Sequence, residues 1–293
     1  MVGDLYVSGD QVHYTKVYET IGSFEIVEAF KYYKIHLSSI EIVHFLVIWT
    51  LSNFISKLLL FSLFNTLLSA LIIRVFDRLK VNFLVTASFV LSNFYLYVLF
   101  FAAERLKFAF IILCLGLSIT FIGKVKNGLI AMSVLGHLQM ILVIAPMVFQ
   151  NLIRSLVRSC RNLRLDLSIL YIVGAILSLS LVSEGIYTKF QAYYSQNNPE
   201  DFFKILIWFV LTLWYTKKTH SSNNVLLIFI PLFCAVYLIG GDRVNMIGYL
   251  YFLVPALQYR RGLNLGILIS TIYFAGKTIF FIESVVRVGH AFG

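Results

Sequence analysis

Apolar runs separated by short polar turns fill most of this chain. The runs fall at residues 38–55, 57–76, 81–103, 105–123, 127–150, 166–183, 203–216, 224–240, 244–259 and 263–282. Several have roughly the 17 to 25 residues that an α-helix needs to cross a bilayer. A soluble helical core would show polar faces at a period of 3.6 residues, and these runs lack them. The pattern predicts an all-α, polytopic transmembrane protein with about 9 to 10 membrane segments.

The composition agrees with a membrane location. The 293 residues are 59% hydrophobic and only 13% charged, whereas soluble domains carry about 25% charged residues. The sequence shows no internal repeat and no linker long enough to separate domains. We therefore expect a single integral membrane domain over residues 1–293, with membrane helices in residues 38–282.

Basic residues gather in short turns between the apolar runs. This arrangement accounts for much of the net charge of +10 and follows the positive-inside rule, so it argues for a bilayer and against a nucleic-acid partner. It places residues 1–37 outside the cytoplasm as a polar loop and residues 283–293 as a short outer tail. The basic turns contain Arg74, Arg78 and Lys80; Lys124 and Lys126; Arg154, Arg158, Arg161 and Arg164; Lys217 and Lys218; and Arg260 and Arg261.

Two segments have an ambiguous path. Residues 127–150 have basic turns on both sides, so one straight crossing would put one turn on the wrong face. A re-entrant pair of half-helices with "GHLQ" at its apex resolves this, and a plain helix with weak orientation signals is the alternative. The run 38–55 either crosses the membrane or lies along its outer interface. Because residues 1–37 hold no apolar core or signal peptide, we also expect a first transmembrane helix to precede Met1.

Polar residues at or within membrane spans are costly and mark functional sites by default. Four groups stand out: "SGDQVHY" (Ser8–Tyr14), "FAAERLKFA" (Phe101–Ala109), "LGHLQMIL" (Leu135–Leu142) and "GGDRVN" (Gly240–Asn245). The predicted topology puts the first, second and fourth at the outer face, and the third could approach it from within the membrane. These groups supply the candidate site residues.

Arg105 and Arg243 are the strongest candidates for anion binding. Guanidinium groups bind phosphate oxygens in bidentate fashion and stay charged at any working pH. Facing one another at headgroup depth, the two arginines would hold a lipid diphosphate. Alternatively, the adjacent Glu104 and Asp242 simply neutralise them at helix ends.

The other polar residues each have two interpretations. Asp10 is either a general base for a sugar hydroxyl or a solvated loop acid, and His137 is either a ligand-binding or a core histidine. Tyr249 belongs to an aromatic belt or stacks on a sugar. Lys57 is predicted to snorkel, and Lys277 either pairs or lines a substrate path. The three cysteines are scattered and no HExxH or nucleotide-binding motif occurs, so we expect neither metal nor cofactor.

The order of these motifs resembles a known family. An outer "GDxxxY" (Gly9–Tyr14) precedes "AERLKFAFIILCLGLSI", then a basic turn with "GLIAMSVLGHLQMILVIAPMVF", an outer "FQAYY" loop and "DRVNMIGYLYF". This order is similar to the Wzy and EpsG group of bacterial surface-polysaccharide polymerases, O-antigen polymerases in particular, and covers nearly the whole chain. The individual motifs are short and degenerate.

The resemblance implies an inner-membrane glycosyltransferase of GT-C-like helical architecture. Such polymerases work at the periplasmic face. They transfer a glycan from undecaprenyl diphosphate onto a new lipid-linked repeat unit without a nucleotide sugar, and a chain-length regulator protein is an implied partner. Asp10, Arg105 and Arg243 would be catalytic, and Tyr14, Glu104, His137, Asp242 and Tyr249 would bind substrate. "AERLK" replaces the family's usual "IRQ" context, and "GHLQM" lacks its serine.

Two other activities compete with this one. A flippase or transporter of lipid-linked oligosaccharides would also need cations in a membrane cavity, but such proteins usually show repeats across two halves. An O-antigen ligase typically carries a large late periplasmic loop, whereas the late outer loop predicted here covers only residues 182–202.

Overall fold

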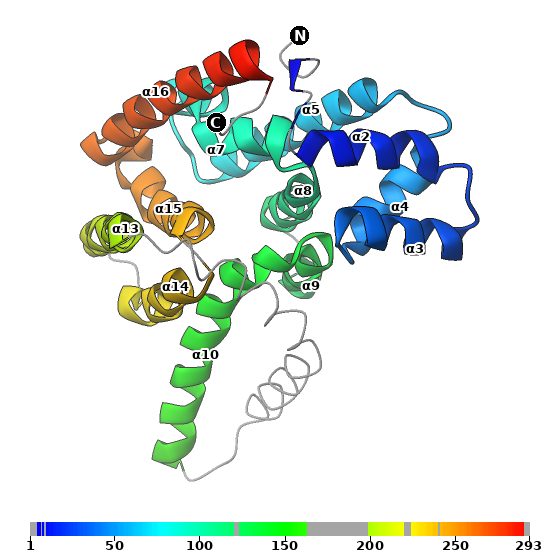
Figure 1. The fold of residues 1–293 in the computed structure, drawn as a ribbon. Coiled ribbons are helices and arrows are strands. Elements are labelled where there is room, and N and C mark those ends of the chain that lie inside the picture. Colours follow the sequence, from blue (N-terminus) through cyan, green and yellow to red (C-terminus); the bar gives the residue numbers. More distant parts are fainter. Residues whose placement is uncertain are drawn as a thin grey trace. The chain divides into compact units, whose positions relative to one another are not determined.

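The computed structural model describes residues 5–6, 8, 10–119, 123–162, 199–219, 224–239 and 241–289, with the side chains of some residues at helix ends, Asp10 and Asp242 among them, outside the described set. Every regular element in these ranges is a helix (Figure 1), which confirms the all-α prediction. Within them, three helices are long and apolar enough to cross a membrane, or up to five if each of two bent pairs counts as one span. The chain therefore has the character of a helical membrane protein.

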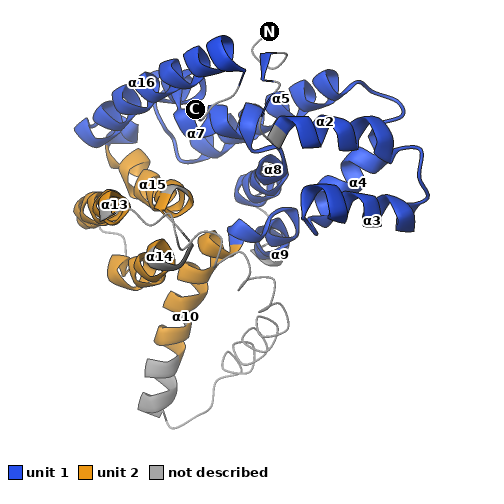
Figure 2. Cartoon of the chain, in the orientation of Figure 1, with its two compact units in different colours: residues 1–140, 260–293 blue, residues 141–259 orange. Residues whose placement is uncertain are grey.

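The chain divides into two compact units, coloured separately in Figure 2. Unit 1 contains residues 1–140 and 260–293, and unit 2 contains residues 141–259. Each unit takes in several of the apolar runs that the sequence analysis placed in a single domain.

Unit 1 opens with two helices where the sequence predicts a polar loop, α2 (Asp10–Ile21) and α3 (Ile26–Leu37). The low hydropathy of residues 1–37 predicts a loop, but their aromatic and apolar residues are spaced as on one face of a helix. Tyr14, Val17, Tyr18 and Ile21 recur at helical intervals, so they share one face, and all four are buried against α4 (Ile42–Leu51) and the start of α5 (Lys57–Arg78). A narrow aromatic stripe is enough to fold this segment, because tyrosine buries a large ring.

The expected run 38–55 is not one continuous helix. Only Ile42–Leu51 is helical, and α3 and α4 form a pair bent by 118°. The bend falls at Ser38, whose backbone is left-handed (φ 47°). It brings the beginning of α4, with Glu41 as its N-cap residue, back toward α2.

The remaining helices of unit 1 fall into two groups: α9 packs on α8, and α16 packs on α6 and α7. They are α6 (Phe83–Ser92), α7 (Phe94–Tyr97), the π-helix η1 (Val98–Ala102), α8 (Glu104–Ser118), α9 (Gly123–Gly136), the 3₁₀ turn η2 (Leu138–Met140) and α16 (Leu265–Val288). Helix α8 contacts α5 and α9 (Figure 1). Most of its residues are buried. Its first turn is therefore an interior position, although its sequence, "ERLK", is charged.

A helix break occurs at the predicted apex. Helix α9 ends at Gly136, His137 is not helical, and η2 follows at Leu138. The sequence prediction of a break at "GHLQ" is confirmed. Since α10 (Ile141–Asn162) belongs to unit 2, the re-entrant path itself stays a prediction.

Unit 2 contains α10, α13 (Pro199–Lys218), α14 (Val225–Ile239) and α15 (Gly241–Gln258). Helix α15 packs closely on α13, where a Cβ atom on Gly248 would lie 2.3 Å from Cδ1 of Ile205. Aromatic rings fill the space beside this contact, with the Trp208 ring 5.0 Å from that of Tyr249 and 5.3 Å from that of Phe252. The backbones approach here because glycine leaves room for the neighbouring side chain.

Candidate functional site

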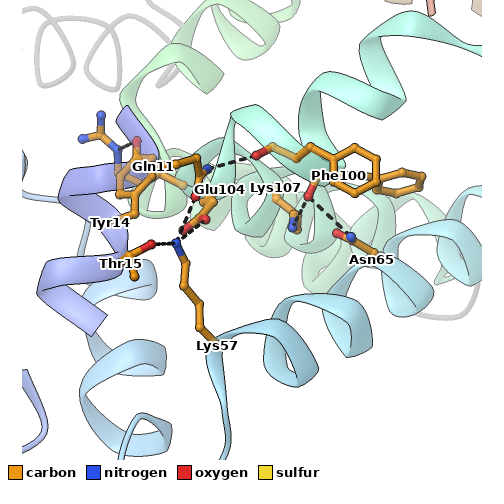
Figure 3. Close-up of polar contacts among 10 residues, drawn as sticks. Gln11, Tyr14, Thr15, Lys57, Asn65, Phe100, Glu104 and Lys107 are labelled. Atoms are coloured by element: carbon orange, nitrogen blue, oxygen red, sulfur yellow. Dashed lines mark hydrogen bonds and ion pairs between the residues drawn. The ribbon is translucent and has the colours of Figure 1, made fainter. Parts of the chain in front are cut away.

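Polar and charged side chains meet inside unit 1 in a group that we call the ionic cluster, and Figure 3 shows the part around Lys57 and Lys107. They come from α2, from α4 and the residue before it, from the first turns of α5 and α8, and from the residue that follows α9. The members are Gln11, Tyr14, Glu41, His44, Lys57, Glu104, Arg105, Lys107 and His137.

The start of α8 supplies three of these side chains. The π-helix η1 and the non-helical Ala103 (φ −104°, ψ 63°) interrupt the apolar run, so α8 begins afresh at Glu104 inside the unit. A carboxylate in the first turn of a helix is favoured by the helix dipole. Glu104, Arg105 and Lys107 thus enter the interior from one short stretch of backbone.

Glu41 is the centre of the first part of the cluster. One carboxylate oxygen, Oε2, accepts a hydrogen bond from Nη1 of Arg105 at 2.9 Å, and the other, Oε1, lies 3.6 Å from Nε2 of His137. Arg105 also donates from Nε to the hydroxyl of Tyr14 at 2.9 Å. Glu41 is only 6% exposed, so this carboxylate depends on its protein partners for solvation.

The ring of His137 has a defined tautomer. The backbone N–H of Gln139 donates to Nδ1 at 3.0 Å, so Nδ1 carries no proton and the neutral ring carries it on Nε2. That N–H faces Glu41. His137 therefore orients the carboxylate that binds Arg105, rather than presenting a free nitrogen.

Lys57 joins the second part of the cluster. Its ammonium lies 2.9 Å from Oε1 of Gln11, 3.0 Å from Oγ1 of Thr15 and 3.1 Å from Oε1 of Glu104, as Figure 3 shows. The prediction that Lys57 snorkels is wrong. The side chain turns inward because α2 and α8 supply three oxygen acceptors there.

Lys107 is a fully buried lysine, with 0% of its surface exposed. Its Nζ donates to the carbonyl of Phe100 at 3.0 Å and lies 4.7 Å from the ring centroid of Phe61. No ion pair joins it to a carboxylate among the described residues. Burial of an ammonium without a carboxylate is costly, so this position favours the arrival of a negative charge.

The carbonyl groups that receive these side chains come from the π-helix. In an i→i+5 segment the carbonyl groups depart from the regular helical ladder. Phe100 O accepts from Lys107 and from Nδ2 of Asn65, and Phe101 O accepts from Nε2 of Gln11 at 2.9 Å. Figure 3 shows Asn65 and Lys107 meeting at one oxygen. The π-helix thus anchors the polar side chains around the cluster.

Aromatic residues of α2 and α3 close the cluster on one side. Tyr33 shares a hydrogen bond with Nδ1 of His44 at 3.0 Å, and the His44 ring is 5.5 Å from that of Phe108. Tyr18 donates to the carbonyl of Ile55 at 2.8 Å. Burial raises the pKa of Tyr18 above its ordinary value, so the hydroxyl keeps its proton and holds α2 over the turn before α5.

The cluster combines three basic side chains, Lys57, Arg105 and Lys107, with two carboxylates, Glu41 and Glu104. With His137 neutral, protonation of all three bases leaves one excess positive charge. A buried site of this kind can accept one anionic group, and its two ion pairs can exchange partners with that group. The alternative interpretation, in which Glu104 neutralises its neighbour Arg105, is not the arrangement found: Glu104 pairs with Lys57, and Glu41 pairs with Arg105.

The structure brings four of the eight predicted site residues together. Tyr14, Glu104, Arg105 and His137 belong to the ionic cluster. Two of the others, Asp10 at the start of α2 and Asp242 in the first turn of α15, have side chains outside the described set.

Two predicted residues lie in unit 2. Arg243 is exposed on α15, and its predicted pairing with Arg105, which is in unit 1, stays a prediction. Tyr249 is 2% exposed, with its ring packed against Trp208 and Phe252. Tyr249 lies in the core of unit 2 because α15 turns that face toward α13, and its predicted place at a membrane boundary stays a prediction.

Five members of the ionic cluster were not among the predicted site residues: Gln11, Glu41, His44, Lys57 and Lys107. The available signal was the interruption of apolar runs: Glu41 and His44 interrupt 38–55, and Lys107 follows Glu104 and Arg105 closely. A charged residue in an apolar run could have been treated as a candidate wherever it occurred. Lys277 also interrupts a run, and in the structure its ammonium lies 5.2 Å from the Phe94 ring and 5.5 Å from the Tyr273 ring.

The approach of α9 to α8 gives a first prediction. A Cβ atom on Gly136 would lie 2.7 Å from Cα and 2.9 Å from N of Ala109, so the backbone of one helix would have to move. We expect Gly136→Ala to lower the free energy of unfolding by about 1–3 kcal/mol, in the range of overpacking substitutions, and to displace His137 from Glu41.

Thermal unfolding of the purified protein in detergent measures this effect. Gly128→Ala is the matched control, since a Cβ there meets nothing within 4 Å in the same helix, and alanine favours helix. Equal melting temperatures for the two variants would contradict a close contact between α8 and α9.

In comparisons with known proteins, no protein-family model, no curated protein and no solved structure matches this chain.

Proposed function

We propose that this chain is a surface-polysaccharide polymerase of the bacterial inner membrane, of the O-antigen type. It transfers a glycan from undecaprenyl diphosphate to a new lipid-linked repeat unit at the periplasmic face. The observation that carries the proposal is the ionic cluster. Tyr14, Glu104, Arg105 and His137, chosen from three separate sequence motifs, meet in one buried group.

The chemistry of the transfer matches the charges in the cluster. A hydroxyl oxygen of the acceptor sugar bonds to the anomeric carbon of the donor glycan while the bond from that carbon to the diphosphate oxygen breaks. The electron pair leaves with the lipid diphosphate, so negative charge grows on the leaving group. Preorganised cations at that position stabilise the transition state, and Lys57, Arg105 and Lys107 are the cations available.

The resting ion pairs have a role in this mechanism. When a diphosphate enters, Arg105 exchanges the Glu41 carboxylate for phosphate oxygens, which a guanidinium binds in bidentate fashion. Glu41 is then free to take the proton of the acceptor hydroxyl as a general base, with His137 holding its other oxygen. Asp10, four positions before Tyr14 on α2, is the alternative base.

The finer architecture belongs to the same proposal. It comprises about 9 to 10 membrane segments in a GT-C-like arrangement, with the break at His137 as the apex of a re-entrant pair. Arg243 would supply a second guanidinium for the diphosphate. The three to five candidate spans in the described residues are compatible with it.

The test is the lipopolysaccharide ladder of a strain deleted for the gene and complemented with variants of the chain. Arg105→Lys keeps the charge and loses the planar fork, so we expect it to shorten the ladder and slow polymerisation by about tenfold to a hundredfold. Arg74→Lys, an exposed arginine on α5, is the matched control and should restore the full ladder.

The pattern of the deletion strain decides between activities. Loss of all bands beyond core plus one repeat supports a polymerase. Loss of the single-repeat band as well would contradict it, and would favour a flippase or a ligase. A full ladder from Arg105→Lys at normal protein level would remove the ionic cluster from the proposed site.

A further inference from the structure

Two basic turns of unit 1 that contain no residue of the ionic cluster lie next to one another. The turn between α5 and α6 carries Arg78 and Lys80, and the turn before α16 carries Arg260 and Arg261. The backbone N–H of Asn82 donates to the carbonyl of Arg261 at 2.8 Å and ties the two turns together. Basic residues far apart in the chain are thereby gathered on one edge of the unit.

Three of these basic residues have a backbone conformation that side chains rarely adopt. Lys80, Arg260 and Arg261 have φ values of 55°, 50° and 56°, in the left-handed region. Residues other than glycine, asparagine and aspartate are uncommon there. Such backbone strain is found preferentially at ligand-binding and switch positions, so these turns are candidates for contact with a ligand.

A cavity of about 440 Å³ opens beside the turns, between α6 and the beginning of α16. Its walls are mainly apolar, from Leu84, Leu265 and Leu268, with Ser88 and Thr271 as small polar positions. Arg260 is the one charged residue among the described residues that line it. We call this cavity the basic groove.

The helices beside the groove are candidate membrane spans. Helix α16 is a candidate membrane span, and α6 with α7 and η1 is a candidate bent span. Leu84, Leu265 and Leu268 are exposed, at 67%, 72% and 55%. An apolar wall that continues into a lipid-facing surface accommodates an acyl chain, whereas a basic rim accommodates the headgroup to which that chain is attached.

We propose that the basic groove binds an anionic phospholipid of the surrounding bilayer. The phosphate lies against Arg260 and the neighbouring basic turns, and an acyl chain follows the leucines of α6 and α16. The positive-inside pattern puts these turns on the cytoplasmic side, where anionic lipids attract basic residues at membrane boundaries. This inference needs only a membrane location and is independent of the proposed polymerase activity.

The experiment uses the full chain purified in detergent, with phosphatidylglycerol or phosphatidylethanolamine of the same acyl chains added. Native mass spectrometry counts bound lipid, and thermal unfolding measures stabilisation. We expect phosphatidylglycerol to bind about fivefold more tightly than phosphatidylethanolamine, the effect of one basic contact at a membrane surface. Arg260→Asn, which suits the left-handed backbone, should remove that preference. Arg287→Asn, which removes an exposed charge at the other end of α16, should retain it.

A second variant tests the cavity. Thr271→Trp fills the groove from α16 and should reduce the binding of phosphatidylglycerol at least fivefold without changing the basic turns. Equal binding of the two lipids by the unaltered chain, or an unchanged preference in Arg260→Asn, overturns the proposal. So does equal binding in Thr271→Trp, or an equal stabilisation by inorganic phosphate alone, which would indicate a free anion instead of a lipid.

Discussion

Glu41→Gln is expected to lower the free energy of unfolding by about 3 kcal/mol, the lower end of the range for breaking a buried ion pair. The Glu41 carboxylate is shared by Arg105, at 2.9 Å, and His137, at 3.6 Å. Glutamine keeps the shape of the side chain at position 41, but it gives the guanidinium of Arg105 a neutral partner at a position with little access to water. Arg105 would then be a partly buried cation without compensation.

The measurement is unfolding of the purified variants in detergent, with an exposed ion pair as the matched control. Glu283 and Arg287 form an i,i+4 pair on α16 at 2.8 Å, with side chains 43% and 74% exposed. Exposed pairs contribute little, so Glu283→Gln should change stability by less than about 0.5 kcal/mol. If Glu41→Gln costs no more than Glu283→Gln, the ionic cluster does not hold unit 1 together.

A double-mutant cycle separates the pair from its surroundings. Arg105→Gln alone leaves the Glu41 carboxylate buried without its cation, which is also costly. The double variant removes both charges, so we expect it to be destabilised by less than the sum of the two single variants. An additive result would indicate that Glu41 and Arg105 act independently, against the contact that the structure shows.

Lys107→Met is expected to separate stability from activity. The side chain is fully buried, has no carboxylate partner among the described residues and bonds only a carbonyl, and Asn65 still donates to that carbonyl when the lysine is gone. Methionine fills a similar volume without a charge. Stability should therefore change by less than about 1 kcal/mol or rise, as when other buried charges are replaced by apolar groups.

Polymerisation should nevertheless fall strongly in the same variant. If Lys107 neutralises charge on the leaving diphosphate, its loss should slow the reaction by about a hundredfold to a thousandfold, comparable to the removal of one preorganised donor. The readout is the lipopolysaccharide ladder at matched protein level. Lys277→Met, which also removes a lysine beside aromatic rings, is the control and should leave the ladder intact.

Stability and polymerisation, measured together on Lys107→Met, distinguish three roles for this lysine. A stable Lys107→Met protein that restores the ladder would make Lys107 a packing residue and weaken the proposed function. An unstable variant would show that the ammonium supports the π-helix carbonyls more than its single hydrogen bond suggests. Only a stable and inactive variant supports a role for this lysine in charge stabilisation.

The break near Gly136 and the start of α8 show how far local sequence reasoning extends. "GHLQ" interrupts an apolar run with glycine and polar residues, and the structure breaks the helix there. "AERLK" was also recognised as a functional stretch, and its residues enter the cluster. Both are local signals, because charge within an apolar run is costly wherever the run ends up.

Residues 1–37 show where the same reasoning stops. Their mean hydropathy is low and their charge is mixed, which predicted a loop. The aromatic residues of α2 nevertheless fold the segment, because they bury their rings on α4 and α5. A helix stabilised mainly by contacts with other elements has a weak local signal.

The sequence by itself determined the class of this protein, all-helical with membrane character, because run length and composition are properties of short stretches of chain. It also identified four residues of the ionic cluster, since each interrupts or borders an apolar run or belongs to a motif. Only the tertiary structure decided which charges pair. Glu41 and Arg105 are 64 positions apart and Lys57 and Gln11 are 46 apart. Coulomb energy and hydrogen bonding depend on distance in space, and that distance is set by how α2, α4, α5 and α8 pack.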